Sequence, residues 1–396
     1  MLVAHGVAAL LAFAWSVVAA RILGPAGFGD YSTAVLIATV LAAFWPFGLI
    51  TAQLSARFAA RKQWPKIAGL LRLARRTLLP AAAVVALALG AVLVLLRDPL
   101  HYRSPLPLFA AAGLWLALAV VTIPKNAIRA LGLWTSYSWF AALEPGLRLA
   151  AGAAVLAVLP TPAAAVCAWA AASAVIAVAA GRILPRHLPA PAAVRLDPRR
   201  LWSLAAPAVL ILTLSTSWQF FDLLIVRWRF GAEPSGVFGA AHTLARTILV
   251  LGMTLDVLFV PLLSRAGLRG TEAARTVARL FGTYALVALP LLAILAFAAR
   301  PVVSILFGST YLAAAPIAFP LAVATFFTYG SAVVAQGLLA VHAFRAPLVW
   351  AGFFAVALIM MTLAPGPLEI AWIGAALSGS AFTAMLVLLF RRLRRS

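Results

Sequence analysis

Two arginines lie deep inside long apolar stretches of this chain, where a charged side chain is costly and needs a reason. Arg148 is near the middle of one stretch in the first half, and Arg246 lies about ten residues into another in the second half. A guanidinium group donates two parallel hydrogen bonds, a geometry that suits phosphate oxygens. We therefore expect the two arginines, one from each half, to attract a phosphate-bearing ligand.

Both arginines have charged neighbours that permit a second interpretation. Glu144 is four residues before Arg148 and shares its helix face, and His242 lies one turn before Arg246. Asp222 is expected at a depth similar to His242. On this alternative, Glu144–Arg148 and Asp222–His242–Arg246 are buried charge groups that only hold helices together.

The stretches that carry these residues are elements of an all-α polytopic membrane protein. The chain has 396 residues, of which 65% are hydrophobic and only 10% are charged. A soluble domain of this composition could not cover its own surface. Glu144, Asp222 and Asp256 are then intramembrane carboxylates, which either pair with a neighbouring base or bind a coupling proton or sodium ion.

Cofactor and metal motifs are absent from the sequence. There is no HExxH, no CxxC and no strand followed by a glycine-rich phosphate loop. Cys167 is the single cysteine, which excludes an intrachain disulfide and a cysteine-based metal site. We expect no cofactor and no metal, and we expect that the protein is not an enzyme.

Twelve apolar blocks approach the length of about 20 residues that a membrane-spanning helix needs. The first block has no Lys or Arg before it, which favours a first transmembrane helix over a signal peptide. The expected blocks are 1–20, 31–52, 78–96, 105–123, 137–158, 162–180, 203–226, 236–260, 280–299, 313–335, 347–364 and 368–390.

The basic residues between the blocks predict the orientation. The chain carries a net charge of +22, and its Lys and Arg divide 23 to 6 between the two sides, with two more inside blocks. The richer side faces the cytoplasm, so both termini are cytoplasmic. Because the charges lie in short connecting segments, topology and anionic membrane lipid explain them better than nucleic acid, which we do not expect as a partner.

A polar segment rich in proline and arginine divides the blocks into two equal sets. It follows the sixth block and contains RHLPAPAAVRLDPRR. We predict an N-terminal lobe of six helices at 1–183, a cytoplasmic linker at 184–202 and a C-terminal lobe of six helices at 203–396.

The two predicted lobes begin with similar turns. RILGPAGFGDYSTA starts at Arg21, and WRFGAEPSGVFGAA starts 207 residues later. Gly231 aligns with Gly24 and Gly236 with Gly29, and we interpret these glycines first as turn formers. The proline and glycines after Arg21 predict a tight turn that a helix cannot continue through. Weak symmetry between halves is typical of transporters built from repeats.

Three motifs resemble the multidrug/oligosaccharidyl-lipid/polysaccharide exporter superfamily, and within it the bacterial oligosaccharide flippases. They are AARILGPAGFGDYSTA (19–34), FDLLIVRWRFGAEPSGVFGAAHTLAR (221–246), in which Phe238 replaces the usual tyrosine, and LFGSTYLAAAP (306–316). The resemblance implies two pseudo-symmetric six-helix lobes around a central cavity in the bacterial inner membrane. It also implies that the cargo is an undecaprenyl-diphosphate-linked oligosaccharide, whose diphosphate Arg148 and Arg246 would attract. Contact with polysaccharide polymerase machinery is a further expectation.

Two other functions remain open. A drug/cation antiporter of the same fold should offer carboxylates to its cargo, whereas arginine is at least as prominent within the blocks here. A membrane polysaccharide polymerase or ligase should carry a long outer loop with His, Arg or acidic residues. The predicted outer segments, such as 97–104 and 227–235, are short.

Overall fold

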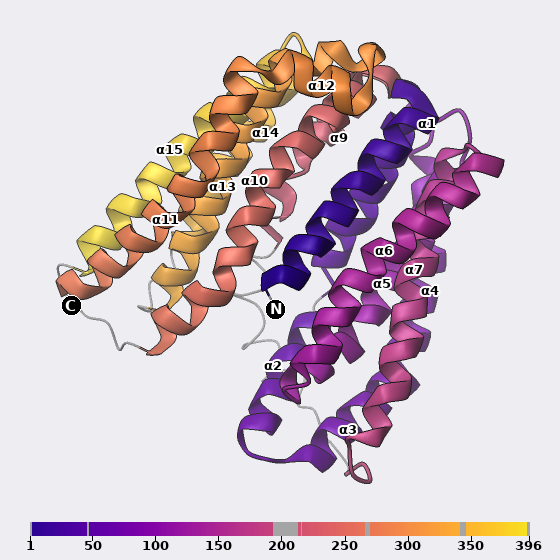
Figure 1. Ribbon diagram of the computed structural model, residues 1–396, viewed down its shortest axis with the longest axis vertical. Coiled ribbons are helices and arrows are strands. Elements are labelled where there is room, and N and C mark those ends of the chain that lie inside the picture. Colours follow the sequence, from indigo (N-terminus) through magenta and orange to yellow (C-terminus); the bar gives the residue numbers. More distant parts are fainter. Residues whose placement is uncertain are drawn as a thin grey trace. The chain divides into compact units, whose positions relative to one another are not determined.

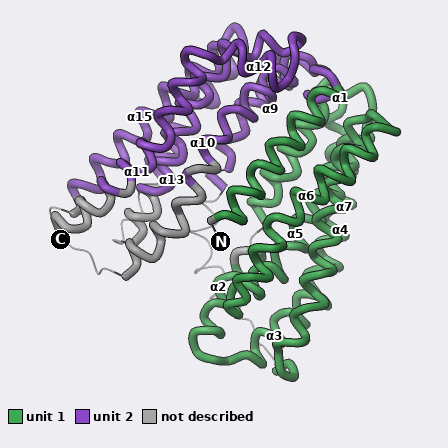
Figure 2. Tube along the Cα trace, in the orientation of Figure 1, with its two compact units in different colours: residues 1–23, 30–209 green, residues 24–29, 210–396 purple. Residues whose placement is uncertain are grey.

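The protein is helical throughout the part of the chain that the structure describes. The computed structural model describes residues 2–45, 47–192, 213–214, 216–265, 270–340 and 346–393. Within these ranges no strand occurs (Figure 1). The chain divides into two compact units, one made of residues 1–23 and 30–209 and the other of residues 24–29 and 210–396 (Figure 2). The predicted lobe boundaries at 183 and 203 remain a prediction.

Unit 1 consists of helices joined by short turns. The start of α7 is capped: the Thr161 hydroxyl accepts a hydrogen bond from the Ala164 N–H, and Pro162 occupies the first helical position. The elements are α1 (Leu2–Ala43, less residues 24–29), α2 (Phe47–Ala60), α3 (Trp64–Leu73), the π-helix η1 (Ala74–Leu78), α4 (Leu79–Leu95), α5 (Leu106–Ala130), α6 (Trp134–Val158), α7 (Pro162–Ile183) and the 3₁₀ turn η2 (Leu184–Arg186).

Unit 2 contains the remaining described helices. The chain bends by 88° between α11 and α12, and α12 ends at Gly308. The elements are α9 (Phe221–Phe230), α10 (Ala232–Arg265), α11 (Gly270–Phe297), α12 (Ala299–Phe307), the 3₁₀ segment η3 (Ser309–Ala314), α13 (Ala315–Ala340), α14 (Ala346–Leu363) and α15 (Pro367–Leu393).

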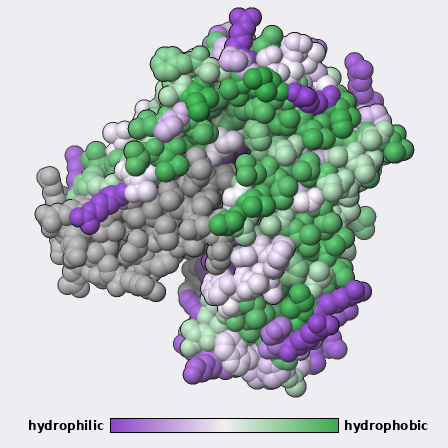
Figure 3. All heavy atoms as spheres, viewed as in Figure 1, coloured by the Kyte–Doolittle hydropathy of each residue, from purple (hydrophilic) through white to green (hydrophobic). Residues whose placement is uncertain are grey.

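The helix surfaces are those of a multi-pass membrane protein. Large apolar side chains point outward, among them Leu87 (77% exposed), Leu95 (78%) and Phe297 (92%), and apolar residues cover much of the visible surface (Figure 3). Within the described residues, seven helices are long and apolar enough to cross a membrane, or eight if α11 and α12 form one broken span. The count of twelve remains a prediction, and much of the block at 203–226 lies outside the described residues.

The connection between the first two apolar blocks is shorter than the sequence predicted. Helical residues continue through 21–43, and the helix is interrupted only at Gly24, which has φ 67° and ψ 175°. Pro25 then occupies the first position of the following helix, where its missing N–H has no partner to lose. The predicted tight turn is therefore confirmed as a break in the helix at Gly24, because one glycine in a conformation closed to other residues is enough.

Three glycines of the described chain share one backbone conformation. Gly24, Gly231 (φ 86°, ψ −160°) and Gly308 (φ 97°, ψ 171°) all combine a positive φ with an extended ψ, a region that side chains exclude. Each of the three sequence motifs contains one of these glycines. In unit 2 the motifs also meet, because Phe28 packs edge-on against Tyr311, with 6.3 Å between ring centroids.

Gly29 and Gly236 allow residues 24–29, the segment of α1 that belongs to unit 2, to touch α10 backbone to backbone. A Cβ on Gly236 would lie 1.7 Å from the carbonyl oxygen of Pro25, and a Cβ on Gly29 would lie 2.0 Å from that of Ala232. Real atoms never approach so closely, so both positions require glycine. The second glycine of each repeated motif is therefore a packing residue, in contrast to the first, which forms a turn.

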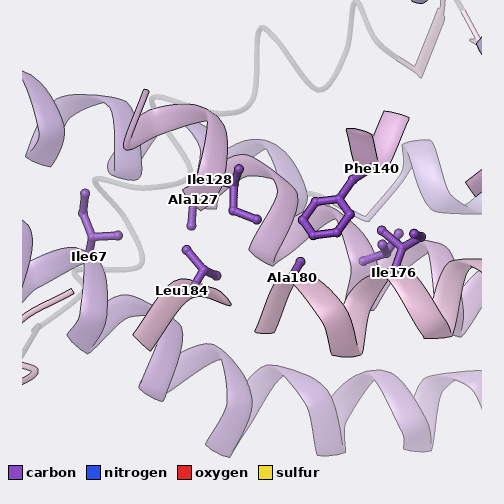
Figure 4. Packing of buried hydrophobic residues seen from close by; sticks show 8 residues of the cluster. Ile67, Ala127, Ile128, Phe140, Ile176, Ala180 and Leu184 are labelled. Carbon is purple, nitrogen blue, oxygen red and sulfur yellow. The ribbon is translucent and has the colours of Figure 1, made fainter. Parts of the chain in front are cut away.

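A buried apolar cluster joins the helices of unit 1 near the end of α7. Phe140 of α6 and Ile176 of α7 lie at one end of the cluster, and Ile67 of α3 lies at the other (Figure 4). The cluster consists of Ile67, Val121, Ala127, Ile128, Phe140, Ile176, Ala180 and Leu184. The predicted linker begins here: Ala192 donates a backbone hydrogen bond to Pro65 at 2.9 Å, and residues 193–202 lie outside the described residues.

We predict that Gly236→Ala destabilises the protein whereas Gly282→Ala does not. The first substitution forces backbone apart, and overpacking of this kind costs about 1–3 kcal/mol. Gly282 lies in α11 with open space around its Cβ direction, so alanine there should be neutral or stabilising by up to about 1 kcal/mol. Thermal unfolding of the detergent-solubilised variants measures both effects. Equal unfolding temperatures for the two variants would show that the backbone contact is not needed.

Candidate functional site

Glu144 of α6 is held by residues from two neighbouring helices. Its Oε2 forms an ion pair with Lys125 of α5, and its Oε1 accepts a hydrogen bond of 2.8 Å from the hydroxyl of Ser173 of α7. Both charged side chains are largely buried, with exposures of 21% for Lys125 and 13% for Glu144. The carboxylate is therefore neutralised by a base that the sequence interpretation did not consider.

Arg148 lies one turn further along α6 and has a different environment. The residue is 6% exposed, and its guanidinium carbon lies 4.0 Å from the centre of a Trp169 ring in α7. Glu144 remains within electrostatic range, as does Tyr31. The guanidinium accordingly rests on an aromatic face, a favourable cation–π position, while the nearest carboxylate is engaged by Lys125.

Two hydrogen-bond donors beside this contact are buried without a partner among the described residues. They are Nε of Arg148 and Nε1 of Trp169. An unsatisfied buried donor costs about 1–3 kcal/mol, so each needs an explanation such as a bound ligand or water. Two cations, Lys125 and Arg148, face one carboxylate, so the group carries one positive charge in excess.

Aromatic side chains from α1 complete the surroundings of Arg148. The indole of Trp15 donates a 2.6 Å hydrogen bond to the hydroxyl of Tyr31, and both residues are buried. Trp15 packs directly on Gly152, where a Cβ would lie 2.5 Å from the indole ring. Because Gly152 is one turn after Arg148 on α6, the small residue lets this tryptophan approach the helix that carries the arginine.

In unit 2 the candidate residues gather where a helix is interrupted. Residues 219–220 form a turn, and α9 begins at Phe221. His242 of α10 lies with Nε2 at 2.6 Å from the carbonyl oxygen of Gln219. Because a carbonyl oxygen only accepts hydrogen bonds, Nε2 of His242 must be protonated and donate this one. The histidine thus satisfies a backbone group that the helix break exposes.

The main contact of the Asp222 carboxylate is with the backbone of the first turn of α9. One carboxylate oxygen accepts a 2.7 Å hydrogen bond from the N–H of Leu223, and negative charge is favourable in the first turn of a helix. Its distance to Nε2 of His242 is 3.9 Å, which is too long for a hydrogen bond. The expected pair is therefore close in space, but each partner has its best contact with the backbone.

Arg246 belongs to the same cluster. Its guanidinium carbon lies 4.3 Å from the ring centre of Phe220, and the Phe220 ring stacks on His242 at 5.9 Å. Asp222 lies within electrostatic range of Arg246. With one cation and one carboxylate, this cluster is balanced, in contrast to the group around Arg148.

The structure also reveals basic residues that the sequence interpretation placed elsewhere. Lys125 was assigned to an inner connecting segment because the block was ended at 123, although α5 continues to Ala130. Arg227 was assigned to an outer segment, yet its side chain is completely buried in α9 and contacts the Ser235 hydroxyl at 3.5 Å.

One candidate cannot be placed in a site. Asp256 lies within α10, and its side chain is outside what the structure describes. Over the described residues, no group of three His, Cys, Asp or Glu side chains is arranged to hold a metal ion. The candidate sites are therefore the excess positive charge at Arg148 and the balanced cluster at the helix break.

Comparison with known proteins shows what the chain is similar to. The model of a family described as polysaccharide biosynthesis protein matches residues 1–266. No curated protein sequence matches the chain. Among solved structures, the lipid II flippase MurJ in an inward closed conformation superposes with a TM-score of 0.71 at 11% identity, covering 99% of this chain and 89% of MurJ.

Multidrug transporters have the same fold. An inward-facing MATE family transporter of the MOP superfamily gives a TM-score of 0.68 at 12% identity over 100% of this chain and 95% of its own. The MATE transporter DinF-BH, in complex with R6G, gives 0.67 at 14% identity over 100% and 94%. The chain therefore belongs to the polysaccharide biosynthesis protein family and has the fold of the MATE-like exporters of the MOP superfamily.

Proposed function

We propose that this protein is a flippase that moves undecaprenyl-diphosphate-linked oligosaccharide from the cytoplasmic to the outer leaflet for surface polysaccharide biosynthesis. It would act as a transporter, by alternating access, and not as an enzyme. Membership of a polysaccharide biosynthesis family supports the cargo class, and the fold shared with a lipid II flippase supports the activity. The observation that carries the proposal is the uncompensated, buried guanidinium of Arg148.

The environment of Arg148 suits a diphosphate. The neighbouring carboxylate of Glu144 forms an ion pair with Lys125, and the buried donors Nε of Arg148 and Nε1 of Trp169 have no acceptor among the described residues. Phosphate oxygens accept charge-assisted hydrogen bonds from both donor types. Burial removes competing water and strengthens such contacts.

Arg246 would have a secondary part in cargo binding. Asp222 compensates its charge, and its guanidinium already rests on Phe220. We therefore assign the main diphosphate contact to Arg148 and a weaker one to Arg246. A coupling proton or sodium ion, if one is used, would bind at Glu144 or Asp222.

The wider arrangement completes the proposal. We propose twelve transmembrane helices in two six-helix lobes around a central cavity, in the bacterial inner membrane with both termini in the cytoplasm. The apolar surfaces of the helices and the 23 to 6 division of basic residues support this arrangement. Contact with polysaccharide polymerase machinery would follow from the same location.

A drug/cation antiporter is the second candidate, because transporters of that class share the fold. A cationic drug would need an available carboxylate. Glu144 is occupied by Lys125 and Ser173, and Asp222 is bonded to the start of α9. These contacts favour the anionic cargo over the cationic one.

We predict that Arg148→Ala lowers export by about 10- to 100-fold, the equivalent of one charge-assisted hydrogen bond of about 1.5–3 kcal/mol. Lipid-linked oligosaccharide should then accumulate on the cytoplasmic side of the membrane in a deletion strain that carries the variant. Arg148→Lys should retain part of the activity, because charge remains while the fork is lost.

Arg129→Ala is the matched control, since Arg129 is an exposed arginine at the end of α5 in the same unit. It should export at the wild-type level, and both variants should be equally abundant in the membrane. Normal export by Arg148→Ala would show that Arg148 does not bind the cargo. Normal surface polysaccharide in the deletion strain, with altered sensitivity to cationic compounds, would establish the antiporter instead.

We predict that Lys125→Met impairs both stability and export, and that adding Glu144→Gln reverses most of the loss. Without Lys125, the largely buried carboxylate loses its partner, which costs about 2–3 kcal/mol. Glu144 would then turn to Arg148 and neutralise it. Thermal unfolding and export of the single and double variants form a double-mutant cycle. A double variant as defective as Lys125→Met alone would disprove this role for the carboxylate.

We predict that Asp98 faces the outside and Arg61 the cytoplasm. Both side chains are exposed in short turns of unit 1. In a Cys167→Ser background, an impermeant maleimide should label Asp98→Cys in intact cells and Arg61→Cys only after permeabilisation. Labelling in the opposite order would reverse the proposed orientation and the direction of transport.

A further inference from the structure

Unit 1 contains a cavity of about 870 Å³ that is separate from the Arg148 site. One wall is formed by α3, the π-helix η1 and the start of α4, and the others by α5 and by the end of α7 with the segment that follows it. Most of the lining is apolar, for example Leu71, Ile123 and Val178. The interior would therefore accept hydrocarbon.

The charged groups that line this cavity are all arginines. Arg72 and Arg75 lie one turn apart on the first wall, and Arg182 projects from α7 on the other. All three are exposed. The described residues provide no carboxylate within ion-pair distance of any of them. The lining thus combines an apolar interior with three positive charges that no carboxylate of the described residues compensates.

The backbone of one wall is irregular where two of the helical segments meet. Residues 74–78 form a single π-helical turn between α3 and α4, and Arg75 lies inside it. Such turns widen a helix at the cost of weaker packing, and they often mark functional positions. Here the irregularity coincides with the cavity wall.

We propose that this cavity binds an anionic glycerophospholipid of the cytoplasmic leaflet. An acyl chain would occupy the apolar interior, and the phosphate would contact Arg72, Arg75 and Arg182. The three arginines belong to the basic connecting segments that the charge distribution places in the cytoplasm. Basic pockets between transmembrane helices on that side bind anionic lipid headgroups. This site does not depend on the identity of the transported cargo.

Charge complementarity selects this occupant over the alternatives. A zwitterionic lipid would leave the three arginines only partly compensated, and free phosphate would leave the apolar walls empty. A lipid held there would also connect the α3–η1–α4 wall to the end of α7, two parts of unit 1 that otherwise meet through the apolar cluster around Ile67 and Leu184.

The test is native mass spectrometry of the purified, delipidated protein with phosphatidylglycerol and, separately, phosphatidylcholine of the same acyl chains. The test variant replaces Arg72, Arg75 and Arg182 by Gln. The control variant replaces Arg76, Arg129 and Arg186 by Gln, which removes the same charge from exposed positions of unit 1 outside the cavity lining. With each basic residue contributing about tenfold or less, the test variant should bind phosphatidylglycerol about 10- to 100-fold more weakly.

The wild type and the control variant should prefer phosphatidylglycerol to phosphatidylcholine and should differ from each other by less than about threefold. Equal binding of the two lipids by the wild type, or equal losses in the two triple variants, would overturn the proposal. Displacement of phosphatidylglycerol by an equimolar polyprenyl phosphate would also overturn it, because the cavity would then belong to the cargo pathway.

A second variant tests the cavity without removing charge. Gly181 lines the cavity and has open space where a Cβ would lie, so Gly181→Leu should fill the space with little strain. It should weaken phosphatidylglycerol binding about tenfold or more while its unfolding temperature without lipid stays near the wild-type value. Unchanged binding by this variant would show that the lipid associates elsewhere.

Discussion

The close contact of two backbones at Gly29 and Gly236 is the constraint on which unit 2 depends. Each glycine belongs to one copy of a repeated motif, and each lies against the carbonyl of a residue in the other copy. Residues 24–29 of the first copy and the whole second copy come from opposite halves of the sequence and belong to one compact unit. The third motif joins them through the contact of Phe28 with Tyr311. Similar sequences therefore recur because they form a shared packing element.

The partners of the buried charges are set by the groups that packing brings nearest to them. Lys125 and Ser173 reach Glu144 from neighbouring helices, and Arg148 is left on the face of Trp169. At the helix break in unit 2, His242 and Asp222 both satisfy backbone groups first. The two clusters contain similar residues, but only the one at Arg148 carries excess charge. This difference gives the two arginines unequal roles in the proposed transport of an anionic lipid-linked glycan.

Much of the architecture was predictable because membrane-spanning helices are long apolar segments that can be recognised in the sequence. Blocks such as 105–123 and 162–180 coincide with α5 and α7, since length and hydropathy alone decide whether a segment can remain in lipid. Helix ends were less predictable. The block at 105–123 ends before the helix does, because α5 continues to Ala130, and the tight turn predicted after Arg21 is a single interruption of the helix at Gly24.

The sequence by itself determined the class of protein, the expected orientation and the residues that could carry charge into the spans. These depend on composition and on local spacing along one helix. Tertiary structure alone decided that Lys125 reaches Glu144, that Arg227 is buried, and that an apolar cavity opens beside three arginines. Such contacts join residues far apart in the chain. Which side chain neutralises a buried charge depends on how helices pack, and spacing along a single helix does not contain that information.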